Sequence, residues 1–223
     1  MTIDCYSNVF CLGGTPIPSA TPTITQTLEP TSTPAPTETP FIFSADYILL
    51  TYEFIDGSDL DTRTRIVTPN IGQNSQPNYV GWGVLTKFPS SPQPHIIEWG
   101  GDNTGNGFES ALINLIELKT QYPESTTVVI DLRSFWYALV GIQPVVVSAT
   151  LWKGGEPIKE YPSGFSFTNP TATSTFNISS AGKIINLQTN WVNSSGDRVA
   201  TLTYNLNTNQ GFFNSEDTVT PTV

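Results

Sequence analysis

Apolar runs in this chain are short, and polar positions and turn residues interrupt them often. Runs of this kind that are rich in β-branched and aromatic residues predict strands. The longest strand-like segments cover residues 46–54, 56–70, 79–88, 95–100, 126–140 and 144–155. Shorter ones follow at residues 164–168, 173–178, 182–192 and 197–206. Turn signals such as Gly154-Gly155 separate them.

One segment has helical spacing instead. Phe108, Ala111, Leu112 and Leu115 share one face of a helix, and Pro123 ends the pattern. We therefore expect one surface α-helix over residues 108–121, with its apolar stripe packed on a sheet. Many strands, a single helix and frequent turns predict a mainly β fold, a β-sandwich.

The N-terminal part has a different composition. Residues 15–40 are almost entirely Pro, Thr, Ser and Ala, and their prolines exclude helix and central strand. Such a segment runs extended, close to polyproline II. We expect an extended arm for subunit contacts over residues 1–45, a β-sandwich domain over 46–210 and a C-terminal tail over 211–223. A disordered or glycosylated stalk is the alternative for the arm.

Charge and residue inventory exclude several functions. The net charge is −10 with nine basic residues, so no nucleic-acid partner is expected, because phosphate binding needs clustered Lys and Arg. No apolar run approaches membrane-spanning length, so no membrane partner is expected. Cys5 and Cys11 can form a small disulfide or stay free thiols. His95 is the only histidine and joins no hydrolytic motif, so we predict no catalytic residues and no enzyme.

Two acidic stretches can hold a metal ion. Asp59 and Asp61 are two positions apart, so an extended backbone presents both carboxylates on one side. Like charges so placed repel unless a cation lies between them. Asp102, Asn103 and Glu109 in the glycine-rich segment can add oxygen ligands. Calcium takes hard oxygen ligands in flexible geometry, so Ca²⁺ is the predicted ion at these five residues.

A simpler interpretation of the same residues exists. Aspartates and asparagines in turns often bond their own backbone, and Arg63 can serve as a salt partner for the pair on the strand. The spacing of the acids does not match an EF-hand loop. Any metal would stabilise loops rather than catalyse, because no general base stands beside it.

The stretch DLDTRTRIV, followed by WGGDNTGNGFESALINL and a strand such as TTVVIDL, resembles the TerD-like tellurite-resistance and stress-response family. The resemblance covers residues 46–155 at most. It implies a β-sandwich that binds calcium through the Asp-Leu-Asp strand and the Gly-rich loop. The positions that match are Asp59, Asp61, Asp102, Asn103, Thr104, Gly105 and Gly107. The family has several more acids where this chain continues Phe108-Glu109-Ser110, so part of its acidic complement is missing.

The chain as a whole is also similar to tailed-phage structural proteins with an LLTYEFIDGSDLDTRT-type strand and a WGGDNTGNGFES-type loop. This similarity implies a structural component of the virion, in the tail, baseplate, fibre or capsid decoration. Its partners would be other virion proteins and copies of itself.

The alternative function is a carbohydrate- or receptor-binding β-sandwich module whose partner would be a host surface glycan. One version of this alternative makes the binding depend on calcium. It predicts an exposed aromatic patch near the acidic loop. The five tryptophans of the chain can supply such a platform or serve as core and interface anchors.

Overall fold

The computed structural model describes residues 44–54, 58–72, 79–89, 94–105, 107–138, 144–175, 181–184 and 196–214. All but the last two positions of the predicted arm lie outside these residues, including Cys5 and Cys11. Residues 215–223 of the predicted tail also lie outside them. Within the described ranges, no helix is long and apolar enough to cross a membrane.

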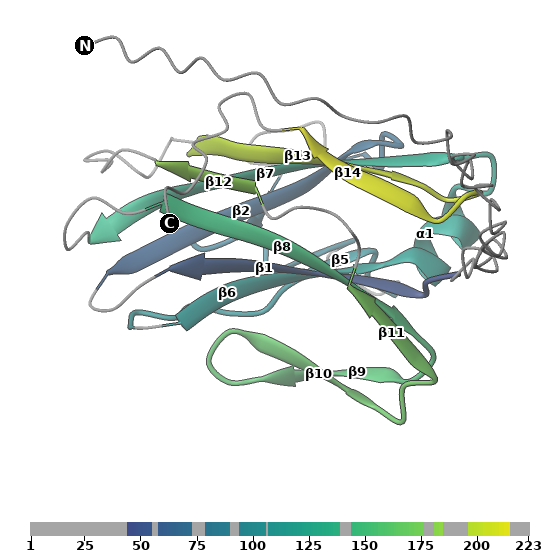
Figure 1. The fold of residues 1–223 in the computed structure, drawn as a ribbon, viewed down its shortest axis with the longest axis horizontal. Helices are drawn as coiled ribbons and strands as arrows, with labels where there is room; N and C mark the ends of the chain where they lie inside the picture. Colours follow the sequence, from purple (N-terminus) through teal and green to yellow (C-terminus); the bar gives the residue numbers. More distant parts are fainter. Residues whose placement is uncertain are drawn as a thin grey trace, which may run out of the picture. The chain divides into compact units, whose positions relative to one another are not determined.

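The first of two large sheets is antiparallel throughout, and six of its seven strands follow the order β11-β8-β1-β6-β5-β4 (Figure 1). The seventh strand, β12, also pairs with β8. The strands are β1 (Tyr47–Phe54), β4 (Lys87–Phe88), β5 (Ile97–Trp99), β6 (Gly107–Asn114), β8 (Pro144–Lys153), β11 (Ala172–Thr175) and β12 (Ala181–Ile184).

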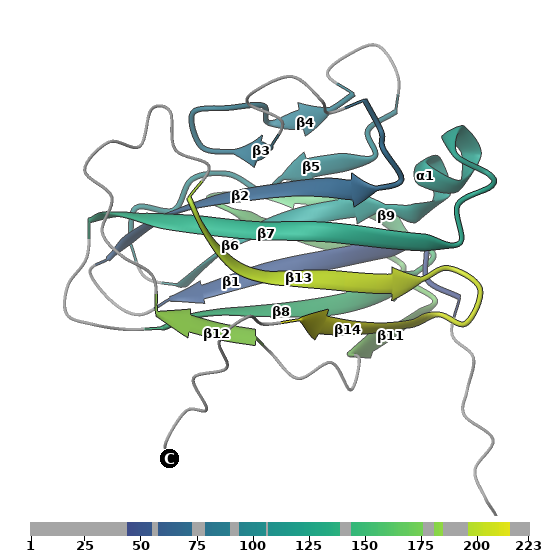
Figure 2. The ribbon, with the colours of Figure 1, turned by 90° about the horizontal axis from the view of Figure 1, so that it is seen from above.

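The second sheet has five antiparallel strands in the order β14-β13-β7-β2-β3. Figure 2 shows its long central strand β7 between β2 and β13. The strands are β2 (Asp59–Thr68), β3 (Val80–Gly81), β7 (Thr127–Ala138), β13 (Asp197–Asn205) and β14 (Gln210–Asn214). Because β3 is so short, it pairs with β2 only at Arg63 and Thr64, and the start of β2 extends past it.

The hydrophobic core lies between the two sheets. Alternate residues of each strand point inward, so Leu50 of β1 and Leu132 of β7 are both fully buried. The hydroxyl groups of Tyr52 and Thr64, 2.7 Å apart, join β1 to β2 through this interior. Two antiparallel sheets around one core confirm the predicted mainly β, sandwich-like fold.

The predicted helix over residues 108–121 is only half correct. Residues 107–114 form strand β6, and helix α1 covers Leu115–Gln121. The side chain of Asn114 begins the helix by accepting the N–H of Glu117 at 3.0 Å. Strand β6 lies between β1 and β5 and is covered on both faces, so its residues 109–113 are all buried. A doubly buried strand loses its alternation, which is why its apolar positions fitted helical spacing.

The body also extends further toward the C-terminus than expected. Residues 211–214, assigned to the tail, belong to strand β14 and pair with β13. Phe213 lies opposite Leu202 and packs on the core, while Phe212 points outward. The turn before β14 is held by Asn205, whose side chain accepts the N–H groups of Asn207 and Thr208. The tail prediction missed this hairpin.

A separate two-stranded hairpin lies beside the first sheet (Figure 1). Its strands are β9 (Glu156–Glu160) and β10 (Gly164–Thr168), of which the sequence predicted only the second. Phe167 stacks on Trp152 of β8 with ring centroids 4.3 Å apart. Lys159 donates to the carbonyl oxygen of Trp99 at 2.9 Å. The hairpin is therefore anchored on β5 and β8 rather than projecting freely.

Candidate metal centre

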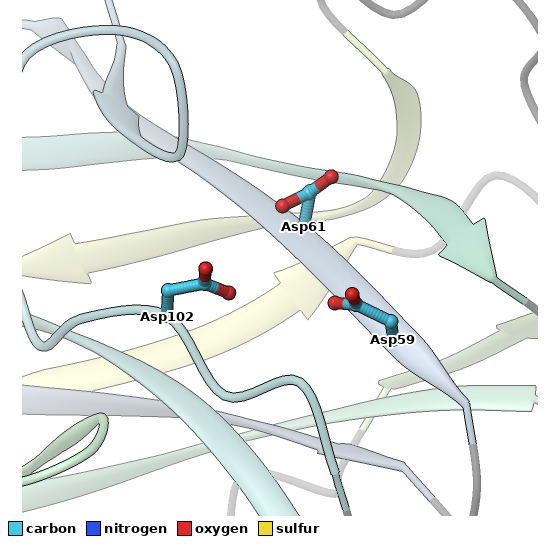
Figure 3. A group of neighbouring side chains, drawn as sticks. All are labelled: Asp59, Asp61 and Asp102. Atoms are coloured by element: carbon cyan, nitrogen blue, oxygen red, sulfur yellow. The ribbon is translucent and has the colours of Figure 1, made fainter.

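Three of the predicted ligands converge at the start of strand β2. Asp59 and Asp61 stand on the outer face of β2, and Asp102 comes from the loop between β5 and β6. One carboxylate oxygen of each lies within 4.8 Å of the other two. Figure 3 shows the three carboxyl groups turned toward a common space. The spacing of two residues in Asp59-Leu60-Asp61 places its carboxylates together, as the sequence predicted, while Leu60 is buried in the core.

These carboxylates form the floor of a pocket of about 210 Å³. Its walls come from three different parts of the chain: Trp82 after β3, Thr104 in the Gly-rich loop and Tyr137 near the end of β7. A volume of this size holds several water molecules, or an ion with part of its hydration shell. The pocket therefore has room for a cation above the acids.

Each acid has an oxygen that the described part of the protein does not satisfy. Asp59 Oδ1, Asp61 Oδ2 and Asp102 Oδ1 are buried and accept no hydrogen bond. The burial of Asp61 is almost complete, with 2% of the residue exposed. Buried polar atoms normally have partners, and a lone buried charge is among the most costly groups in a protein. Three acids that each have such an oxygen, and whose carboxylates converge, fit a divalent cation.

The pKa shifts of the three aspartates also favour a bound cation. Burial, together with the charges of Asp59 and Asp102, raises the pKa of Asp61 to about 7, although the nearby Arg63 acts in the opposite direction. The pKa of Asp59 is also raised, by burial and then by Asp102. Burial likewise raises the pKa of Asp102, against a hydrogen bond from Trp82. The carboxylates are thus destabilised in their charged form, and a bound cation would remove this penalty.

Arg63 is the salt partner considered from the sequence. Its guanidinium carbon lies 5.2 Å from the centre of the Phe135 ring, in a cation–π arrangement. It is also the weakest of the four influences on the pKa of Asp61. Arg63 therefore offsets only part of the negative charge at the pocket.

Glu109 lies beneath the group of three and has a different environment. It is fully buried, and its Oε2 accepts hydrogen bonds from Thr62 N at 3.1 Å, Thr62 Oγ1 at 2.6 Å and Trp99 Nε1 at 3.2 Å. Its Oε1 accepts the N–H of Asn103 at 3.3 Å. Burial raises the pKa of Glu109 to about 8, partly offset by these donors.

The position of Glu109 explains this bonding. Strand β3 pairs with β2 only at Arg63 and Thr64, so it offers no partner to the backbone N–H of Thr62. The carboxylate of Glu109 accepts that N–H instead. The same carboxylate also holds the loop that carries Asp102, through the N–H of Asn103. Glu109 is therefore placed as a support for the candidate ligands, and it is not one of the three acids that converge.

Asn103 also supports the loop from within. Its Oδ1 accepts the N–H of Gly105 at 3.2 Å, and its Nδ2 donates to the carbonyl oxygen of Phe108 at 3.2 Å. This is the capping role that Asn commonly has in turns. Of the five predicted ligands, the structure thus brings three together and places two in the scaffold of the loop.

The turn of the β9–β10 hairpin explains two of the loop glycines. A Cβ atom at Gly100 would clash with the carbonyl oxygen of Ser163, and one at Gly101 with that of Pro162. Gly101 also has a φ of +133°, which side chains rarely adopt. Ser110 closes the contact by donating to the carbonyl oxygen of Ser163. The residues just before Asp102 are therefore fixed by a hairpin about sixty positions away, and no local pattern in the sequence indicates this.

Tyr137 is the site residue that the sequence analysis did not name, and Trp82 entered it only as one of the five tryptophans that could form a platform. Their ring centroids lie 6.5 Å apart, with an angle of 37° between the planes, and Tyr137 is 55% exposed. Tyr137 shares the outward face of Asp59 and Asp61, two positions after Phe135, which pairs with Asp61. Alternation along β7 could have placed it there, given the strand pairing. Trp82 follows a two-residue strand and gave no such signal.

Fold and site together define a β-sandwich with an acidic, aromatic-walled pocket at one strand end. Comparison with protein-family models, curated proteins and solved structures finds no match to this chain. The resemblance to the TerD-like family and to phage structural proteins therefore stays a prediction from the sequence.

Proposed function

We propose that this chain is a calcium-binding β-sandwich module, in which one ion is held by Asp59, Asp61 and Asp102. The observation that carries the proposal is the buried Oδ2 of Asp61, which has no hydrogen-bond partner among the described residues, in a residue whose carboxylate converges with those of Asp59 and Asp102. The alternative from the sequence, local capping by Asp59 and Asp61, leaves these oxygens without a bond.

The ligand chemistry favours calcium over other common divalent ions. All three candidate ligands are carboxylate oxygens, whereas zinc sites use nitrogen and sulfur more often. Magnesium requires near-ideal octahedral geometry and short distances, while calcium accepts about six to eight oxygens at flexible geometry. Two acids on a strand and one on a loop give irregular geometry, which suits calcium better.

The role of the ion would be structural. It would join the first residues of β2 to the loop that carries Asp102. At these residues β2 pairs with β7 on one side but not with β3 on the other. Glu109 and the hairpin turn already hold that loop from below, so the ion would complete an existing arrangement. A fixed loop of this kind serves a virion component or a receptor-binding module equally well, and both wider roles stay predictions.

Isothermal titration with calcium tests the proposal. The wild-type chain should give a saturable one-site isotherm at or below the millimolar range. Asp61→Asn and Asp59→Asn, which remove one charge without changing side-chain shape, should abolish the heat. Glu124→Gln is the matched control, because it removes an exposed acid outside the pocket and should bind like wild type. Absence of heat from folded wild-type protein at millimolar calcium would disprove the proposal.

A further inference from the structure

The pocket combines an acidic floor with an aromatic wall. Trp82 and Tyr137 line it together with the three aspartates, and the exposed ring of Tyr137 offers an apolar face beside the oxygens. Apolar faces next to a few converging polar groups are typical of sites for small organic ligands.

Three carboxylates leave calcium incompletely coordinated. Binding through one oxygen each gives three ligands, fewer than the roughly six to eight that calcium takes. All three carboxylates line the pocket, so an ion that they hold would border its open space. Water or hydroxyl groups of a ligand can fill the remaining coordination positions of the ion. The volume of about 210 Å³ suits a fragment of a ligand rather than a whole drug-sized molecule.

The net charge at the pocket favours a neutral ligand over an anion. The three carboxylates carry more negative charge than one divalent ion neutralises, and the whole chain has a net charge of −10. A phosphate or sulfate group would meet no surplus positive charge on the filled site, apart from the partly compensating Arg63. Hydroxyl groups can replace water on calcium without bringing further negative charge.

We infer that the pocket binds a neutral carbohydrate through its calcium ion. Two adjacent hydroxyl groups of a sugar would complete the coordination sphere, and the apolar face of the sugar ring would pack against Tyr137. Trp82 would close the other side of the pocket and orient Asp102, to which it is hydrogen-bonded. This inference rests on the proposed calcium site and adds a ligand class to it.

An immobilised panel of glycans ending in mannose, fucose, galactose or glucose tests the inference, read in calcium and again in EGTA. Wild type should bind at least one glycan in calcium and release it in EGTA. Tyr137→Ala should lose most of that binding, at least tenfold, while its calcium isotherm stays unchanged. Tyr137→Phe, which keeps the ring, should restore glycan binding. Phe212→Ala is the control, because it removes an exposed aromatic ring on β14 that does not line the pocket.

The outcomes separate the two proposals. Loss of the calcium isotherm in wild type would remove the ion site itself. A normal isotherm with no glycan retained, or with Tyr137→Ala binding glycan like wild type, would overturn the carbohydrate inference and leave the ion site standing. Calcium-dependent binding to phosphatidylserine vesicles in place of any glycan would also overturn it, because it would show that the site selects anions.

Discussion

Two aspartates on the outer face of the second sheet are almost equally buried and have opposite electrostatics. Asp61 on β2 is 2% exposed and Asp131 on β7 is 1% exposed. Burial raises the pKa of Asp61, and two neighbouring acids add to the effect. Burial acts on Asp131 in the same direction, but hydrogen bonds and charges from Arg198 and Arg133 reverse it and lower its pKa.

The contacts of Asp131 show what compensation requires. Its Oδ1 accepts a hydrogen bond from Arg198 Nε at 2.8 Å, and its Oδ2 accepts one from Arg133 Nε at 3.0 Å. Tyr79 donates its hydroxyl to the same Oδ2 at 3.1 Å, and Arg65 lies 3.5 Å away. The fold thus surrounds Asp131 with arginines, whereas at Asp61 the nearby Arg63 offsets only part of the negative charge. The calcium ion proposed above would supply the remaining positive charge that Asp61 lacks among the described residues.

Replacing Asp131, the carboxylate that the arginines compensate, should change the free energy of unfolding more than the other two substitutions below. Asp131→Asn removes the charge to which the partly exposed Arg133 and Arg198 donate. We expect the free energy of unfolding to fall by about 2–4 kcal/mol at neutral pH, because a hydrogen bond to a charged group contributes roughly 1.5–3 kcal/mol. Because its folded pKa is lowered, the contribution of Asp131 is present above the unfolded pKa near 4 and is lost as the pH falls through the folded value. Urea unfolding at neutral and acidic pH measures both. A loss below about 1 kcal/mol would show that the arginines do not stabilise the sheet.

A substitution in the loop that positions Asp102 should lower the free energy of unfolding by a smaller amount. Gly101→Ala places a Cβ against the carbonyl oxygen of Pro162 at a positive φ, so the loop or the hairpin turn must move. We expect about 1–3 kcal/mol of destabilisation, together with weaker calcium binding, because Asp102 is the next residue. Gly105→Ala is the control, since its Cβ would meet only the Asn103 side chain at 3.7 Å. Equal calcium affinity in wild type and Gly101→Ala would mean that the hairpin does not position Asp102.

Replacing Asp61, the uncompensated carboxylate, should change the free energy of unfolding by an amount similar to that for Gly101→Ala but in the opposite direction. In calcium-free buffer at neutral pH, Asp61→Asn should raise the free energy of unfolding by about 1–3 kcal/mol, because it deletes a charge that burial and two acids disfavour. The pKa of Asp61 is raised to about 7, so the penalty is absent below the unfolded pKa near 4 and grows as the pH rises toward 7. Unfolding curves of both proteins across this range measure the difference. Destabilisation by Asp61→Asn at neutral pH without calcium would refute the contrast with Asp131.

The sequence predicted the β-sandwich and the shared face of Asp59 and Asp61 because both follow from the alternation of side chains along an extended strand. Asp59 and Asp61 needed only an extended backbone to share a face, and Asp102 joined them through the resemblance of its loop. The sequence also offered Glu109 as a ligand, but it could not show the inward direction of this side chain, which depends on the pairing of β6 with β1. The error in the helix has the same origin, since residues 108–114 form a strand only because neighbours cover both of its faces.

The remaining features depend on contacts between distant segments. Trp82, which follows β3, and Tyr137 of β7 meet at the pocket, and the turn at Pro162 and Ser163 fixes the glycines before Asp102. No pattern within a short stretch encodes such contacts. Sequence reasoning can therefore predict which residues could bind an ion, but strand pairing decides which of them are free to do so.

The most direct test is a crystal structure of the chain grown in millimolar calcium, with anomalous data to identify the ion. The account predicts one peak between the carboxylates of Asp59, Asp61 and Asp102, at about 2.3–2.6 Å from their oxygens, with open positions facing Tyr137. Clear density for these side chains without a peak, or with a lysine or arginine of the chain in that space, would contradict it.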